Sequence, residues 1–300
     1  MRCPRLGASL GRPRNVASRV REKSHMKRRH FISLGFAAIG TSAFRSDQLR
    51  AAQRTQWQAD GAGSLARIGV LTPDDDPVPE SEMWTMAPQG VSIHTSRVPW
   101  NHEARSFAEP PHVDSAAELL ARLTPRVVVY AFTSSSYVLG AQADDSLRVR
   151  LEKHVQGIPV VITCQAAVEA FRTLSAHRVA VINPPWFTEE VNSKGMDYFR
   201  TQGFEVVLCA RITPDRQFTE VPPAEVYEWT RTHVPREAEV VFIAGNGLRA
   251  VGAIHSLEES LRRPVLSANQ VAFWKALRIV GMPSKATHYG RIFSMSGPTR

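Results

Sequence analysis

The chain has 300 residues, of which 43% are hydrophobic, so it is long enough for one or two domains with a sizeable core. Its formal net charge of +9 is concentrated at the start. Residues 1–50 hold twelve Lys or Arg and two Asp or Glu, whereas the other 250 residues carry a net charge of −1. The charge therefore argues against a basic folded domain, and we expect no nucleic-acid binding.

Residues 1–45 are typical of a leader that directs export. Paired arginines, Arg28 and Arg29, precede a short apolar run at 31–39 and then small residues at 40–43. This pattern resembles a twin-arginine signal and predicts the twin-arginine machinery as a partner and a periplasmic or secreted location. The run is too short for a stable membrane anchor. The alternative is a basic tail, and either Met1 or Met26 is the start.

Residues 46–65 are polar and weakly patterned, which predicts a linker to the folded domain. A first strand is expected at 67–71, followed by an acidic loop at 72–77, a helix from Glu80 and an alternating strand at 91–98. In the acidic loop, Asp76 either binds a cation, takes a proton or lies in a solvated turn.

Strands and helices then alternate to the end of the chain. A capping box at 114–118 predicts the start of a helix, and a buried strand at 127–132 follows. Later strands are expected at 158–163, 178–182, 204–209, 240–243 and 264–267, and helices at 147–155, 165–174, 188–202, 223–233, 248–261 and 270–280. This alternation predicts an α/β fold with parallel sheet, whose ligands bind beyond the carboxyl ends of the strands.

The strand at 240–243 ends in a turn of small residues, Ala244 to Gly247, before a helical pattern. Backbone N–H groups at such a turn can bind an anion. The turn lacks the spacing of a dinucleotide-binding loop, and no cluster of His or Cys has metal-ligand spacing, so neither a cofactor nor a metal is expected.

Several stretches carry a family resemblance that covers about residues 66–293. They are Gly69-Val70-Leu71-Thr72-Pro73 with Asp76 and Glu80, Ala131-Phe132-Thr133-Ser134, Phe187-Thr188-Glu189-Glu190-Val191-Asn192, Gly247-Leu248-Arg249, Leu257-Glu258, Pro264-Val265-Leu266-Ser267-Ala268-Asn269-Gln270 with Trp274, and His288-Tyr289-Gly290-Arg291-Ile292-Phe293. Their order and spacing resemble the maleate isomerase and arylmalonate decarboxylase branch of the aspartate/glutamate racemase superfamily.

The resemblance implies two Rossmann-like parallel-sheet halves related by a pseudo-twofold axis, with the site between them. The halves are predicted at 66–160 with 270–300, and at 161–269. In this superfamily the racemases and maleate isomerases use two cysteines at paired strand ends, and the decarboxylase keeps only the second as proton donor. The matching positions here are Phe132 and Gly245, neither of which has a side chain that transfers protons.

Two further departures remove hydrogen-bond donors. Asp76 stands where the family has an Asn, and Phe187 stands where it has a Tyr. An ionised Asp only accepts hydrogen bonds, so it would repel a substrate carboxylate. The substrate-binding residues implied by the resemblance are Pro73, Asp76, Thr133, Ser134, Phe187, Gly245, Asn246 and Gly247.

Other residues are weaker candidates. Cys164 follows a strand and is either a displaced nucleophile or a buried thiol at a helix start, whereas Cys209 is expected in the core. His94 or a bound water could supply an acid or base. Arg249 binds a carboxylate or pairs with Asp76 or Glu80. The tryptophans that could line an aromatic pocket are Trp84, Trp100 and Trp186.

Two functions follow. The first is an exported protein that binds a small carboxylate between the halves, with its cysteine-dependent chemistry lost or rewritten. If active, it would be an isomerase, racemase or decarboxylase. The alternative is a non-catalytic periplasmic binding protein that uses the same cleft. A homo-oligomer is left open.

Overall fold

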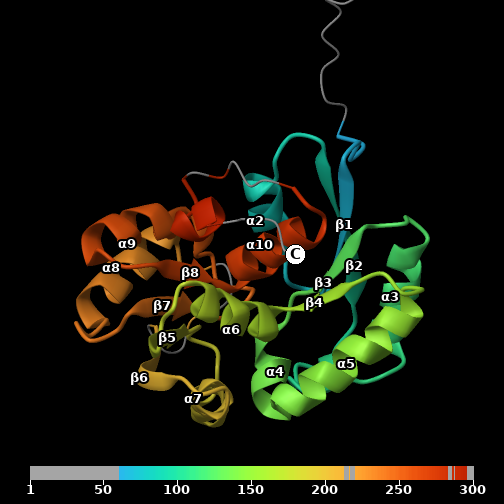
Figure 1. Ribbon diagram of the computed structural model, residues 1–300. Coiled ribbons are helices and arrows are strands. Elements are labelled where there is room, and N and C mark those ends of the chain that lie inside the picture. The colour runs from blue at the N-terminus through green and yellow to red at the C-terminus, as the bar shows by residue number, and fades with distance from the viewer. Residues whose placement is uncertain (1–60, 213–215, 217–219, 283–285, 287, 296–300) are drawn as a thin grey trace, which may run out of the picture. The chain divides into compact units, whose positions relative to one another are not determined.

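The computed structural model of the protein describes residues 61–212, 216, 220–282, 286 and 288–295. These residues form two four-stranded sheets in which all neighbouring strands are parallel (Figure 1). The predicted leader, with its twin-arginine pattern, and most of the predicted linker lie outside the described residues. Both therefore stay predictions.

The two sheets repeat one strand order. The first runs β2-β1-β3-β4, with β1 (Ala66–Pro73), β2 (Val91–Val98), β3 (Val127–Tyr130) and β4 (Val160–Ile162). The second runs β6-β5-β7-β8, with β5 (Arg178–Asn183), β6 (Glu205–Arg211), β7 (Val240–Ile243) and β8 (Val265–Ser267). The predicted α/β fold with two parallel-sheet halves is confirmed. The chain passes to the second sheet after β4, and the exact division into halves stays a prediction.

The central strands are hydrophobic throughout because both faces of each sheet are covered. In the first sheet, Ile68 and Val70 face one core, whereas Leu71, Val128 and Tyr130 face a second core on the other side. The second core is closed by α3 (His112–Ala121) and α5 (Ala141–His154). The alternation of side chains along a strand thus distributes the buried residues between two layers.

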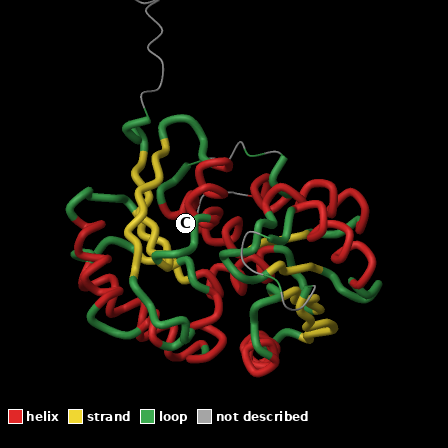
Figure 2. Tube along the Cα trace, turned by 180° about the vertical axis from the view of Figure 1, so that it is seen from behind, coloured by secondary structure: helices red, strands yellow, loops and turns green. Residues whose placement is uncertain are grey.

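Two helices lie between the sheets and join the halves. They are α6 (Thr163–Thr173) and α10 (Ala268–Ile279), and α10 contacts β3 and β4 of the first sheet and β8 of the second. Figure 2 shows the two groups of strands set apart, with helices between them. The core of α2 (Val78–Met86), α6 and α10 is continuous with the core of the second half. The two halves therefore share one hydrophobic core.

The remaining helices are α4 (Thr133–Leu139), α7 (Glu189–Thr201), α8 (Pro223–His233) and α9 (Ile254–Leu261). Several predicted boundaries are wrong, among them the start of α5, at Ala141 instead of residue 147. The helix at α3 begins at His112, before the expected capping box, and Asp114 instead pairs with Arg150 at 3.1 Å. The strand expected at 127–132 ends at Tyr130, and α4 begins at Thr133. The helix after β7 begins at Ile254, with a short 3₁₀ turn at Val251–Ala253 before it. Among the helices of the described residues, none is long and apolar enough to span a membrane.

Candidate functional site

One pocket gathers the loops that follow strands of both sheets. Its cavity volume is about 140 Å³. A cavity of roughly 150 Å³ accommodates a molecule the size of benzene, so this pocket suits a small ligand. It is lined by the eight residues proposed from the sequence, Pro73, Asp76, Thr133, Ser134, Phe187, Gly245, Asn246 and Gly247, and by Trp100, His102, Ala104, Phe132, Trp186, Thr188 and Val191.

Phe132 and Gly245, which the sequence resemblance aligns with the family's cysteines, both line this pocket. Phe132 follows β3, is 8% exposed, and packs with its ring centroid 4.3 Å from that of Phe107 and 5.0 Å from that of Trp100. Gly245 follows β7 with φ +80°. A Cβ atom there would lie 2.5 Å from Cγ of Pro184, so the local backbone excludes any side chain without a shift. The ends of β3 and β7 thus both contribute to the pocket, and neither Phe132 nor Gly245 carries a thiol.

One side of the pocket offers hydrogen-bond donors. Within the described residues, the backbone N–H groups of Gly245, Asn246 and Gly247 donate to no protein acceptor, and the hydroxyl of Ser134 has no hydrogen-bond partner. Unpaired N–H groups at a turn after a strand suit an anion. This side of the pocket can therefore bind a carboxylate.

A buried chain of hydrogen bonds lies behind Thr133. The Thr133 hydroxyl donates to Oδ1 of Asn246 at 2.7 Å, and Nδ2 of Asn246 donates to Oδ1 of Asn269 at 2.8 Å. Nδ2 of Asn269 then donates to the carboxylate of Glu82 at 2.7 Å and to the carbonyl of Asn246 at 2.8 Å. The other Glu82 oxygen accepts from the backbone N–H of Val251 at 2.9 Å. Glu82 thus connects α2 to the turn after β7.

Asp76 is the titratable group of the acidic loop that enters the pocket. It is 3% exposed, and its Oδ1 accepts from the backbone N–H of Val78 at 3.0 Å. Burial is the main cause that raises the pKa of Asp76 to about 6, and the charge of Asp75 adds to the rise. Asp74 and Asp75 are exposed. The prediction of a solvated turn is therefore wrong for Asp76.

An aromatic wall, formed by Trp100, Phe132, Trp186 and Phe187, lines the pocket. The indole N–H of Trp100 donates to Asp75 at 3.1 Å, and the Trp100 ring lies 5.0 Å from the His102 ring. Trp186 and Phe187 line the pocket from the other half. Trp84 is 42% exposed on α2 and does not line the pocket, so its proposed aromatic role is wrong.

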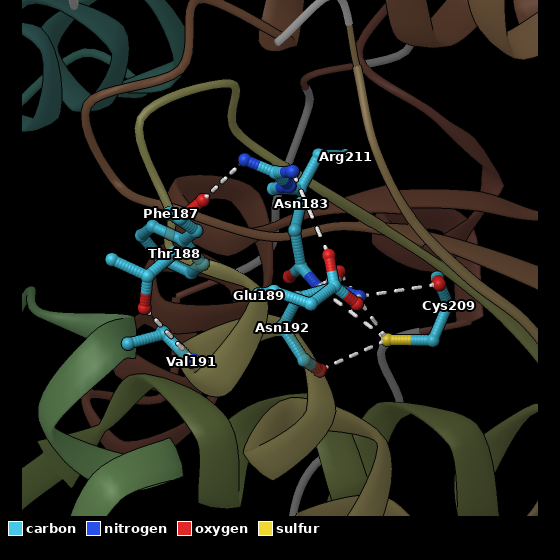
Figure 3. Close-up of polar contacts among 8 residues, drawn as sticks. All are labelled: Asn183, Phe187, Thr188, Glu189, Val191, Asn192, Cys209 and Arg211. Atoms are coloured by element: carbon cyan, nitrogen blue, oxygen red, sulfur yellow. Dashed lines mark hydrogen bonds and ion pairs between the residues drawn. The ribbon is translucent and has the colours of Figure 1, made fainter. Parts of the chain in front are cut away.

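Figure 3 shows how the loop after β5, which carries Phe187 and Thr188, is held in place. A guanidinium nitrogen of Arg211 donates to the carbonyl of Phe187 at 2.9 Å, and the Thr188 hydroxyl accepts from the N–H of Val191 at 3.2 Å. Nearby, Asn183 donates to Oδ1 of Asn192 at 2.8 Å. Residues of β5, β6 and α7 therefore fix the aromatic side of the pocket.

The cysteines do not enter the pocket. Cys164 is fully buried at the start of α6, where its thiol contacts the carbonyl of Thr133 at 3.8 Å. Burial raises the pKa of the Cys164 thiol well above its usual range, which disfavours the thiolate. The thiol of Cys209 contacts the carbonyl of Asn192 at 3.3 Å (Figure 3). Cys164 is thus not placed as a displaced nucleophile, because it is fully buried and is not among the residues that line the pocket.

Two further candidates lie elsewhere. His94 contacts the Ser92 hydroxyl at 2.8 Å within β2 and does not line the pocket. Arg249 is exposed and borders a separate cavity beside Glu82. Glu80 pairs with Arg97 at 3.0 Å, so the proposed pairing of Arg249 with Asp76 or Glu80 is wrong. In the part of the chain that the structure describes, no three His, Cys, Asp or Glu side chains are grouped as a metal site would require.

Sequence reasoning missed the supporting residues Glu82, Arg97 and Arg211. Each acts on a residue that is distant in the chain, as when Glu82 contacts Asn269. No local pattern marks such a residue. The one signal for this network in the sequence was the position of Asn269 directly after a strand end, where residues near a ligand site are expected.

Comparison with known proteins decides the family. The sequence profile of the arylmalonate decarboxylase family matches residues 106–293, which is more than half of the chain. The chain belongs to the arylmalonate decarboxylase family. This match covers β3 to β8 and the loops after β3, β5 and β7, whereas the pocket residues up to Ala104 precede it.

Individual relatives agree with this assignment. The chain is 26% identical over 175 residues to an arylmalonate decarboxylase of Bordetella bronchiseptica, covering 57% of this chain and 72% of the relative. It is 22% identical over 245 residues to a maleate isomerase of Geobacillus stearothermophilus, covering 76% of this chain and 97% of the relative.

Solved structures of both kinds share the fold. A maleate isomerase from Pseudomonas putida S16, solved with maleate, superposes with a TM-score of 0.70 at 21% identity, covering 77% of this chain and 98% of the other. An arylmalonate decarboxylase superposes with a TM-score of 0.65 at 23% identity, covering 77% of this chain and all of the other. At these identities the likeness establishes the two-sheet architecture of the family.

Proposed function

We propose that the chain binds a small carboxylic acid in the pocket between the two sheets, and that cysteine-dependent chemistry has been lost there. The observation that carries this proposal is the meeting of two strand ends in one pocket. Unpaired donors follow both ends, at Ser134 and at Gly245–Gly247. At the two positions where the family's cysteines are expected, the pocket has Phe132 and Gly245.

The carboxylate is proposed to bind the N–H groups of the turn after β7 and the hydroxyl of Ser134. Oriented backbone N–H groups stabilise an anion without a positively charged side chain. This arrangement matters because no Lys or Arg is among the residues that line the pocket. The apolar part of the ligand then contacts the aromatic wall.

A second candidate function is proton transfer to or from the bound acid by Asp76. The pKa of about 6 favours this role, since a general acid or base works best when its pKa is near the working pH. The location of Asp76 on the pocket surface supports it as well. Solvent deuterium incorporation into a bound acid, lost in Asp76→Asn, would support this function.

We also propose export through the twin-arginine pathway, supported by Arg28 and Arg29 before the apolar run at 31–39. A small acid in the periplasm or outside the cell would then be the ligand. This part of the proposal is independent of the pocket and has its own test in the Discussion.

Saturation-transfer NMR tests ligand binding, with the monocarboxylates 3-methylbutanoate and phenylacetate as probes. We expect transfer from the protein to the probes, and loss of transfer in Ser134→Leu, which fills the donor side of the pocket. Asp74→Asn is the matched control, because Asp74 is exposed on the neighbouring loop. Equal transfer to the probes in the wild type and in Ser134→Leu would overturn the proposed location of the site.

A further inference from the structure

Asp76 is a buried carboxylate that lacks an ion-pair partner. None of the ion pairs among the described residues includes it, and its one side-chain hydrogen bond is the backbone N–H of Val78. The guanidinium of Arg97 lies nearby, but it donates to the backbone carbonyl of Asp76 at 2.9 Å and to the carboxylate of Glu80 at 3.0 Å. Buried charges in proteins are normally paired. A cationic group of a ligand can supply the partner that Asp76 lacks among the described residues.

Thr133 adds a second acceptor to the same pocket. The Glu82 carboxylate and the Asn246 carbonyl only accept, so they fix the amide of Asn269 with its NH₂ group towards them. The Asn269 oxygen then faces the NH₂ group of Asn246, whose own oxygen faces Thr133. The Thr133 hydroxyl must therefore give its proton to Asn246, and its oxygen offers lone pairs to a ligand.

The same pocket contains the aromatic wall. Trp100 and Phe132 lie edge to face with centroids 5.0 Å apart, and Trp186 and Phe187 line the pocket from the second half. Aromatic faces attract organic cations, and more strongly where water is excluded. A carboxylate, a hydroxyl acceptor and an aromatic wall therefore line one pocket.

We propose that the ligand carries a protonated alkylamine beside its carboxylate, with the ammonium group bound by Asp76 and Thr133 and its alkyl groups against the aromatic wall. This inference rests on the proposed function for the carboxylate end of the ligand. It distinguishes an ammonium carboxylate from a dicarboxylate such as maleate. A second carboxylate would meet Asp76, and no Lys or Arg lines the pocket to compensate.

Titration calorimetry at pH 8 with a pair of isosteres tests the inference on the full chain. N,N-dimethylglycine and 3-methylbutanoate have the same shape, but the first has a protonated nitrogen where the second has a carbon. We expect N,N-dimethylglycine to bind about tenfold more tightly or better, in line with a desolvated cation beside aromatic rings. The variant Asp76→Asn should remove this difference, and Asp74→Asn should keep it.

The outcomes separate the inference from the proposed function. Equal affinities of the two isosteres for the wild type would overturn the ammonium site and leave the carboxylate site standing. Binding of trimethylammonium without binding of 3-methylbutanoate would overturn the carboxylate site and support the ammonium site. Failure of all three probes to bind would overturn both. The comparison of isosteres on the wild type decides the matter even if Asp76→Asn does not fold.

Discussion

At the scale of single residues, the backbone at Gly245 disfavours any side chain. Its φ of +80° is a conformation that glycine adopts freely and other residues adopt at a cost. The nearby Pro184 also occupies the space of a Cβ atom. A cysteine at this position would therefore require a different backbone path after β7.

We predict that Gly245→Ala lowers the free energy of unfolding by about 1–3 kcal/mol, because it combines backbone strain with a steric overlap. Chemical denaturation measures the change. Gly252→Ala is the matched control, since a Cβ at Gly252 has only an ordinary contact of 3.7 Å with Pro223 and its φ is not positive. Equal effects of the two substitutions would show that Gly245 is not strained.

Asp76 makes ligand binding depend on pH. An ammonium group binds the ionised carboxylate, and the pKa of Asp76 is about 6 in the absence of a ligand. Protonation below this pKa removes the charge that attracts the ligand. Besides burial, the charge of Asp75 raises this pKa, whereas the charge of Arg97 lowers it. The charge of Asp76 in turn raises the pKa of Glu82, so the ionisation of Asp76 also affects Glu82.

We predict that the affinity for N,N-dimethylglycine falls about tenfold between pH 8 and pH 5, as expected when a bound cation stabilises one ionised group of pKa about 6. The affinity for 3-methylbutanoate should fall by less than about twofold in this range, because only part of this acid is protonated at pH 5. Calorimetric titrations at four pH values provide the measurement. An affinity of the ammonium probe that is constant down to pH 5 would exclude Asp76 as its partner.

At the scale of elements, one buried carboxyl joins three helices next to the pocket. Asp144 of α5 accepts from the Ser136 hydroxyl of α4 at 2.9 Å and from the Tyr198 hydroxyl of α7 at 2.8 Å. Burial is the main cause that raises the pKa of Asp144 to about 7. The contact links α4, which carries Thr133 and Ser134, to the second half.

A carboxyl whose pKa is raised on folding stabilises the protein fully at low pH, and this contribution is lost as the pH rises through the folded-state pKa. For Asp144 the loss falls between about pH 4 and pH 7. We predict that Asp144→Asn, which cannot ionise, flattens this dependence and is more stable than the wild type at pH 8 by about 1–2 kcal/mol. Thermal unfolding of both proteins at pH 5 and pH 8 measures it. A wild type whose stability rises from pH 5 to pH 8, in parallel with the variant, would contradict the prediction.

Most strands and helices could be predicted because their patterns are local. The run at 240–243 and the alternation at 91–98 match β7 and β2 directly. The start of α3 could not be predicted, because Asp114 was assigned to a cap but forms an ion pair with Arg150, which is distant in the chain. The helix at 133–136 is stabilised by contacts of the same kind, such as the Ser136 bond to Asp144.

The candidate site likewise has a part that could be predicted from the sequence and a part that could not. Its lining residues follow strand ends, and the topology of a parallel sheet brings strand ends together, so all eight predicted residues meet at one pocket. The hydrogen bond between Glu82 and Asn269 joins residues far apart in the chain. The direction in which Thr133 donates depends on that bond, so it required the structure.

At the scale of the whole molecule, a repeated strand order builds one pocket from two halves. Strand ends from both sheets supply its residues, and α6 and α10 join the two halves in one core. The family's architecture is therefore retained, while Phe132 and Gly245 stand at the positions that we align with the family's cysteines. Retention of the fold with a changed pocket is what a new ligand preference requires.

The proposed export is also a property of the whole molecule. We predict that Arg28→Lys with Arg29→Lys keeps the charge of the leader but prevents export of the full chain, because twin-arginine recognition requires the arginine pair. Cell fractionation with an antibody to the protein measures its location. As a control, Arg45→Lys, which lies after the apolar run, should leave export unchanged. Export of the double variant at the wild-type level would contradict the proposed pathway.

The central claim is that a small acid binds between the two sheets without the help of a thiol. Titration calorimetry of Cys164→Ala with Cys209→Ala against 3-methylbutanoate tests it, with NMR on the same sample to follow maleate and phenylmalonate over time. We predict an affinity within about twofold of the wild type, well under the tenfold that 1.4 kcal/mol would cause, and no thiol-dependent conversion of either acid. Conversion of maleate or phenylmalonate by the wild type that disappears in the double variant would contradict the account.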